Sequence, residues 1–167
     1  ERVMGSVERF LQKRLRLQIN RDKSAVERPW KRKFLGYSVT FHLQPRLKVA
    51  PESIRRLKGK LRDRLRPARG RHLETVMEEL TPLITGWVGY FRLSEVKGSF
   101  EQLDEWLRRR IRAAQWRQWK KPHTRTRKLM RLGLDPDRAW SSAYNGRGPW
   151  WTAGASPMHQ ALPTRRL

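Results

Sequence analysis

Residues 106–134 carry eleven lysines and arginines and no acidic residue. Three tryptophans, Trp106, Trp116 and Trp119, lie among them. Guanidinium and ammonium groups bind phosphate oxygens, and flat aromatic rings stack on bases and sugars. A stretch of one charge sign with interspersed rings therefore indicates a polyanion that also carries bases. Nucleic acid fits this chemistry better than a membrane surface or an acidic protein does.

The charge of the whole chain points the same way. Its 167 residues include 39 Lys and Arg against 15 Asp and Glu, which gives a formal net charge of +24. A charge of this size concerns partners and association rates, and it does not determine the fold. The alternative is a well-solvated basic surface, which leaves the self-repulsion without a counter-charge.

Several other kinds of site are not expected. The chain has no cysteine, which excludes disulfides and cysteine-based zinc sites. Its histidines, His42, His72, His123 and His159, are scattered, so we expect no metal or other cofactor in this chain. No stretch approaches the ~20 apolar residues that span a bilayer, and no signal peptide is visible. Because Glu1 begins inside an expected helix, we expect the true N-terminus to be missing.

The first fifty residues predict a helix, a strand and a hairpin. Apolar residues recur at helical spacing over 3–11, residues 16–20 alternate as in a strand, and 20–24 form a polar turn. Residues 35–41 alternate again, and 47–49 begin a returning strand. Gly36 within this hairpin is open to two interpretations, a bulge or the close approach of another backbone.

Three apolar stripes at helical spacing predict a three-helix bundle after Pro51. The stripes consist of Ile54, Leu57, Leu61 and Leu65; Leu73, Met77, Leu80, Ile84, Trp87, Val88 and Phe91; and Leu103, Leu107, Ile111 and Ala114. The second stripe keeps its phase across Pro82, where we expect a kink or short break.

The third helix has a charged face opposite its apolar stripe. At roughly 100° per residue, Trp116 and Trp119 fall on the charged face with Arg108, Arg109 and Arg112. They either stack on a nucleic acid or pack under residues after Pro122, and we expect Trp116 to stack and Trp119 to be buried. Arg110 and Arg117 fall within the apolar arc, where they must extend to solvent, pair with an acid or mark a groove between helices.

Beyond Pro122 the pattern weakens. Residues 125–132 predict a short helix ending at Gly133. Asp135 and Pro136 predict the cap and first position of another helix, to about Ala143. The remainder reads as irregular, held against the bundle by Trp150 and Trp151.

Four motifs follow one another along the chain. They are Leu17–Ser24, which ends in Lys-Ser; Phe34-Leu35-Gly36-Tyr37; Gly86-Trp87-Val88-Gly89-Tyr90-Phe91; and the basic segments Leu103–Arg110 and Trp116–Lys120. Their order resembles the C-terminal part of bacterial group II intron-encoded proteins, which are reverse transcriptases with maturase activity. The second and third motifs are similar to the family's Phe-Leu-Gly-aromatic and Gly-Trp-x-x-Tyr-Phe signatures. Gly148-Pro149-Trp150-Trp151 resembles the family's tail.

The resemblance implies a mainly α fold. Residues 1–50 would be a small α/β palm remnant with a primer-holding β-hairpin. Residues 51–121 would be the three-helix thumb, or maturase domain, and residues 122–167 a basic, partly irregular helical extension. Contacts to the primer–template are expected from Lys23, Ser24, Leu35, Gly36 and Tyr37. Contacts to RNA are expected from Arg55, Arg56, Arg62, Arg108, Arg109, Arg112, Trp116, Arg117, Lys120, Lys121, Arg125, Arg127 and Lys128.

The chain differs from the family because it lacks the paired catalytic aspartates. The family polymerises through paired aspartates, including a Tyr-Ala-Asp-Asp motif, and no such pair occurs here. We interpret Glu78, Glu79, Asp135 and Asp137 as structural, and expect no catalytic residue and no polymerase activity in this chain alone. Mg²⁺ is expected for the full-length enzyme, in which upstream fingers and palm would supply the carboxylates.

Three hypotheses follow for the function. The first is the RNA-binding thumb and maturase region of a group II intron reverse transcriptase, with intron RNA and an RNA/DNA primer–template duplex as partners. The second, from the enzyme class, is a reverse transcriptase whose catalysis is supplied upstream of these residues. A stand-alone basic RNA-binding or splicing factor without a polymerase partner is the alternative to both. The third is an unrelated basic structural protein, such as a ribosomal one. The first implies a bacterial cytoplasmic location in association with nucleic acid and away from membranes.

Overall fold

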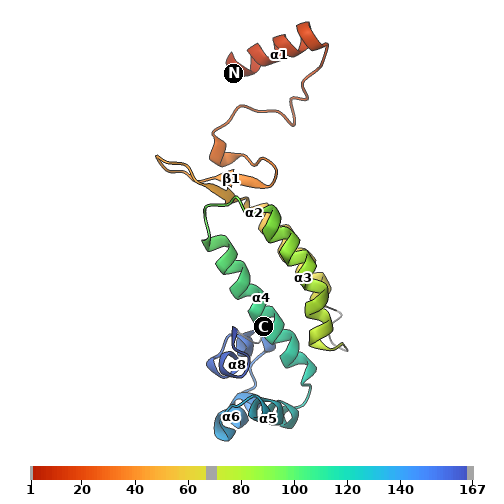
Figure 1. Ribbon diagram of the computed structural model, residues 1–167, viewed down its shortest axis with the longest axis vertical. Helices are drawn as coiled ribbons and strands as arrows, with labels where there is room; N and C mark the ends of the chain where they lie inside the picture. Colours follow the sequence, from red (N-terminus) through yellow and green to blue (C-terminus); the bar gives the residue numbers. More distant parts are fainter. Residues whose placement is uncertain (1, 67–70, 165–167) are drawn as a thin grey trace.

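The computed structural model describes residues 2–66 and 71–164, which are mainly helical with one small sheet (Figure 1). Its elements, in order, are α1 (Arg2–Leu15), the 3-10 helix η1 (Pro29–Lys31), β1 (Tyr37–Val39), β2 (Leu47–Val49), α2 (Pro51–Leu65), α3 (Leu73–Tyr90), α4 (Gly98–Gln118), α5 (Pro122–Arg131), α6 (Pro136–Tyr144), α7 (Pro149–Ala153) and α8 (Ser156–Ala161). The expected mainly α fold with a β-hairpin is confirmed. Among the described helices, none has the length and apolar character needed to cross a membrane.

The predicted three-helix bundle is formed by α2, α3 and α4. Its core consists of the buried residues Leu57, Leu61, Val76, Leu80 and Leu103. α2 begins with Pro51 in its first turn, where the missing N–H breaks no helical hydrogen bond. α3 runs through Pro82 as one helix, so the expected break is absent and the apolar stripe keeps its phase.

The predicted hairpin pairs β1 with β2 in antiparallel register, with Tyr37 opposite Val49. Gly36 precedes β1 with a φ of +80°, which favours glycine. A Cβ at this position would lie 2.9 Å from Ser53 Oγ and 3.0 Å from Phe91 Cζ. The close approach at Gly36 is therefore made by side chains of α2 and of the end of α3.

The expected strand at residues 16–20 is wrong. α1 ends at Leu15, Arg16 has a φ of 52°, and the segment that follows is irregular. Alternation alone does not make a strand without a neighbouring strand to receive its hydrogen bonds, and the sheet of the described residues contains only β1 and β2.

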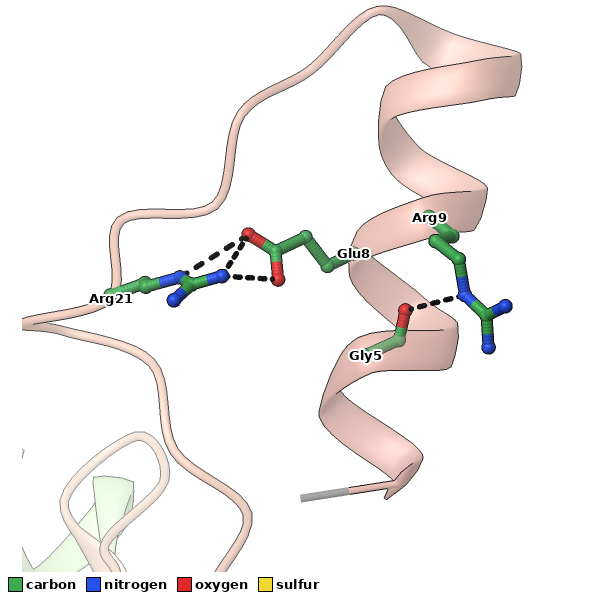
Figure 2. Close-up of polar contacts among 4 residues, drawn as sticks. All are labelled: Gly5, Glu8, Arg9 and Arg21. Carbon is green, nitrogen blue, oxygen red and sulfur yellow. Dashed lines mark hydrogen bonds and ion pairs between the residues drawn. The ribbon is translucent and has the colours of Figure 1, made fainter.

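The polar turn at residues 20–24 is confirmed. The Asn20 side chain accepts hydrogen bonds from the backbone N–H groups of Asp22 and Lys23. Next to it, the Arg21 guanidinium binds both carboxylate oxygens of Glu8 on α1, with a closest distance of 3.0 Å (Figure 2). This ion pair connects the loop to α1, which lies at one end of an elongated molecule (Figure 1).

A second core lies at the opposite end, where α5, α6 and α8 pack on the last turns of α4 (Figure 1). It contains Trp116, Trp119, Leu129, Leu134, Ala139, Met158, Ala161 and Leu162. α5 begins at Pro122, earlier than expected, and Asp135 caps α6 as predicted by accepting hydrogen bonds from the N–H groups of Asp137 and Arg138. This core combines α4 with the residues expected to form the C-terminal extension.

The segment after Gly148 is not irregular throughout, because it contains α7 and α8. Both are only one or two turns long, and each has a proline at its start. Their buried residues, Thr152, Ala153, Met158 and Ala161, are too few to produce a visible helical stripe in the sequence.

A basic and aromatic surface as a candidate nucleic-acid interface

The residues expected to bind RNA occupy three environments. Arg55, Arg56, Arg62, Arg117, Lys120, Lys121 and Arg127 are exposed; Arg108, Arg109, Arg125 and Lys128 are half-buried; and Arg112 and Trp116 are buried. α4 carries residues of all three kinds because it touches both cores, so parts of its charged face are covered by α5, α7 and α8.

Trp116 does not project from the basic face as expected. It is 1% exposed, Trp119 is 5% exposed, and their ring centroids lie 6.2 Å apart in the second core. A ring covered in this way has no free face for a base. The burial of Trp119 is confirmed, whereas the stacking role foreseen for Trp116 fails because the residues after Pro122 fold back over α4.

Arg112 and Arg125 also make contacts inside the protein. Arg112 is 4% exposed, and its Nε donates to the carbonyl of Leu162 at 3.0 Å. The Arg125 guanidinium lies 4.6 Å from the Trp116 ring centroid, and its Nε donates to the Trp119 carbonyl at 2.8 Å. Burial lowers the pKa of both guanidinium groups, and for Arg112 the nearby Arg108 adds to the effect.

The Trp106 ring contacts cationic side chains from two helices, α2 and α4. Lys58 Nζ lies 5.3 Å from its ring centroid, and the guanidinium carbons of Arg62 and Arg110 each lie 5.5 Å away. These distances are in the range of cation–π attraction. Because Lys58 and Arg62 belong to α2 and Trp106 to α4, the cluster extends the basic surface from α4 onto α2.

Arg110 joins this cluster to Trp150 of α7. Its guanidinium also lies 4.9 Å from the Trp150 ring centroid, and its buried Nε has no hydrogen-bond partner among the described residues. Burial, followed by the nearby Arg62 and Arg117, lowers its pKa. Of the alternatives foreseen for Arg110, the structure shows a position between helices. Arg117, in contrast, is exposed.

Trp150 is a candidate residue that sequence reasoning did not select. The Arg109 guanidinium lies 4.4 Å from its ring centroid, and Arg109 Nε donates to its carbonyl at 3.1 Å. The ring remains 38% exposed. Its place directly after Gly148-Pro149, in a strongly basic chain, was the available signal. We call Lys58, Arg62, Trp106, Arg109, Arg110 and Trp150 the basic–aromatic surface.

The residues expected at the primer–template lie in two places. Leu35, Gly36 and Tyr37 are held against the end of α3, where the Tyr37 hydroxyl donates to the Tyr90 carbonyl and the Tyr90 hydroxyl donates to the Leu35 carbonyl. Lys23 and Ser24 lie instead in the loop between α1 and η1. The structure therefore brings Leu35, Gly36 and Tyr37 together, because their motif contacts the motif at the end of α3. Lys23 and Ser24 are not part of this contact.

The acidic residues that the structure describes do not form a metal site. In residues 2–66 and 71–164, no group of three or more His, Cys, Asp or Glu side chains could hold a metal ion. Asp135 caps α6, as interpreted from the sequence. Glu79 pairs with Arg71, whose hydrogen bond lowers the pKa of that carboxyl group. These carboxylates are thus already used within the fold.

Comparison with known proteins agrees with the motifs. Residues 54–133 match the family model described as the group II intron, maturase-specific domain. No curated protein matches the chain. The matched segment starts in the first turn of α2 and ends just after α5, so it contains the three-helix bundle and most of the basic–aromatic surface. Residues 54–133 therefore belong to the group II intron maturase-specific family, as the sequence motifs indicated.

Proposed function

We propose that this chain binds folded group II intron RNA through the basic–aromatic surface and the exposed arginines and lysines beside it. The family gives the coarser statement, a maturase role in the splicing of group II introns. The observation that carries the proposal is the alternation of tryptophans and cations across α2, α4 and α7. Such a surface can bind phosphates and sugars together.

The contacts expected from this surface are mainly to the RNA backbone. A-form RNA has a deep, narrow major groove that side chains cannot read, so helical RNA is recognised by its shape, its phosphates and its 2′-hydroxyls. Exposed cations at Arg55, Arg56, Arg117, Lys120 and Arg127 suit that mode of binding. Binding of this kind stabilises a folded RNA because it favours compact arrangements of phosphates.

In the full-length protein, the same region would hold a primer–template duplex. Leu35, Gly36 and Tyr37 form a tight corner against α3, and Gly36 keeps the backbone free of a side chain there. The fingers and palm that hold Mg²⁺ would lie outside this chain. The acids described above do not fit a magnesium site, so no step of polymerisation is assigned to these residues.

The test is the affinity of the chain for a group II intron RNA and for an unstructured RNA of the same length, measured at several salt concentrations. Each neutralised phosphate contributes roughly −0.7 to −0.9 to the slope of log K against log salt, and a clamp with about six to ten contacts gives a steep dependence. We expect tighter binding to the structured RNA. A slope shallower than about −2 would show that the basic surface is not the binding surface.

A further inference from the structure

A recess of about 610 Å³ lies between α4 and the C-terminal helices. Its lining includes Arg108, Arg109 and Arg112 of α4, Trp150 and Gly154 at the two ends of α7, and His159 of α8. Three guanidinium groups and an imidazole therefore line one concave site. It adjoins the basic–aromatic surface through Arg109 and Trp150.

The lining of the recess carries more positive than negative charge, because three arginines stand beside two carboxylates, Asp104 and Glu105. Asp104 pairs with Arg108 at 2.7 Å, and Arg108 also donates to the Thr164 carbonyl. Arg109 and Arg112 each donate only their Nε to a carbonyl oxygen, and no carboxylate of the described residues pairs with either. Glu105 is the further acid on the lining.

Arg112 is the most buried of the three arginines, at 4% exposed, and this burial lowers its pKa. A buried cation without a counter-charge is destabilising unless an opposite charge arrives. The planar guanidinium fork matches the oxygens of a phosphate group. The chemistry of the recess therefore favours an anion with several oxygens.

The Arg109 guanidinium lies at the edge of the recess, in the space that a side chain at residue 154 would occupy. A Cβ on Gly154 would lie 2.8 Å from Arg109 Cζ and 2.9 Å from its Nε. Gly154 has a φ of −95°, which any residue adopts, so a side chain added there would not strain the backbone and would instead push the Arg109 guanidinium aside. The guanidinium thus fits between Gly154 and the Trp150 ring.

We infer that this recess binds a single phosphate group, held by Arg109 and Arg112 with His159 beside it. The phosphate is either one diester of the bound RNA or free inorganic phosphate, since both present the same oxygens. The RNA source rests on the proposed function, whereas the site itself does not.

The first experiment uses inorganic phosphate alone. Thermal unfolding of the full chain is compared in sodium phosphate and in sodium chloride at equal ionic strength. A ligand that binds the folded state raises Tm with its concentration, while the general salting effect of phosphate is shared by all variants. Arg109→Gln removes one guanidinium, and Gly154→Ala displaces that guanidinium without changing the net charge.

The matched control is Arg147→Gln, because the Arg147 guanidinium lies 5.0 Å over Trp151 in the same way but does not line the recess. We expect phosphate to raise the Tm of the wild-type chain and of Arg147→Gln in a saturable way. We expect no such rise in the Tm of Arg109→Gln or Gly154→Ala. An equal rise in all four proteins would overturn the inference.

The second experiment identifies the source of the phosphate. If an RNA diester occupies the recess, Arg109→Gln makes the salt slope of RNA binding shallower by about 0.7 to 0.9, and Arg147→Gln leaves it unchanged. An unchanged slope together with a lost phosphate effect assigns the site to free phosphate. If the unchanged chain binds no RNA, the proposed function fails, and the thermal experiment still decides whether the recess is a phosphate site.

Discussion

Tyr37 and Tyr90 lie 53 residues apart in the chain, and each donates its hydroxyl to a backbone carbonyl of the motif that contains the other. The Tyr37 hydroxyl donates to the Tyr90 carbonyl at 2.6 Å, and the Tyr90 hydroxyl donates to the Leu35 carbonyl at 2.9 Å. Their rings stack with centroids 6.2 Å apart. The hairpin is thus fixed to the end of α3 by side chains from both partners.

Removal of either hydroxyl should loosen this junction. We expect Tyr37→Phe and Tyr90→Phe each to lower the free energy of unfolding by about 0.5–1.5 kcal/mol, the usual net value of one hydrogen bond. The double variant should lose less than the sum, because the two residues share one contact. Urea unfolding measures all three. Tyr144→Phe is the control, since no hydrogen bond involves its hydroxyl among the described residues, and an equal loss there would refute the specific role.

Trp116→Ala should affect folding and not RNA contact. A fully buried tryptophan replaced by alanine leaves a large cavity, so we expect a loss of about 3–5 kcal/mol in the free energy of unfolding. RNA affinity per folded molecule should be unchanged. The check is urea unfolding and RNA affinity on the same protein, and weak binding by a stably folded variant would restore a direct role for Trp116.

Trp150→Ala should show the opposite pattern. Its ring is part of the basic–aromatic surface and is partly exposed, so stacking on a nucleotide would contribute about 1–3 kcal/mol of binding free energy. Trp140→Ala is the matched control, because Trp140 is an exposed tryptophan on α6 that stacks on Tyr144 outside this surface. Fluorescence anisotropy with labelled intron RNA measures both, and similar losses in the two variants would contradict the assignment.

His159 should make stability depend on pH. Burial, then the nearby Arg112 and Arg109, lower the pKa of His159 below the usual histidine value of 6.5, and Glu105 opposes them. The unfolded chain therefore binds more protons than the folded one, so stability increases as pH rises towards 6.5 and is lost progressively below it. NMR titration should give a midpoint below 6.5. Chemical unfolding from pH 5 to 7 should show a flatter profile for His159→Gln, whereas an unchanged profile would exclude this contribution.

The elements that the sequence predicted well are those whose signal is local. The stripe from Leu57 to Leu61 and the Asp135 cap depend on residues within a few positions of each other, and both are confirmed. The alternation at residues 16–20 was equally local, but a strand also needs a partner strand that the pattern cannot supply. Local rules therefore predict helices more safely than isolated strands.

The candidate site was less predictable because it depends on which face of α4 is covered. A helical plot places Trp116 and Arg112 correctly around the axis, but it contains no information on α5 or α8, which bury them. Likewise, the contact of Arg109 with Trp150 joins residues 41 positions apart, and no spacing rule connects them. Charge and aromatic content indicated the partner, while the geometry required the folded chain.

α4 is one continuous helix whose residues belong to both cores. It therefore connects the two cores rigidly. At 1.5 Å per residue, its 21 residues extend roughly 31 Å. The phase of this helix sets the angle between the bundle and the C-terminal core, because each added residue rotates one end by about 100° relative to the other. Two RNA segments bound at opposite ends of α4 would be held at a fixed distance and a fixed relative rotation. The protein would thereby determine how these two segments are arranged in space.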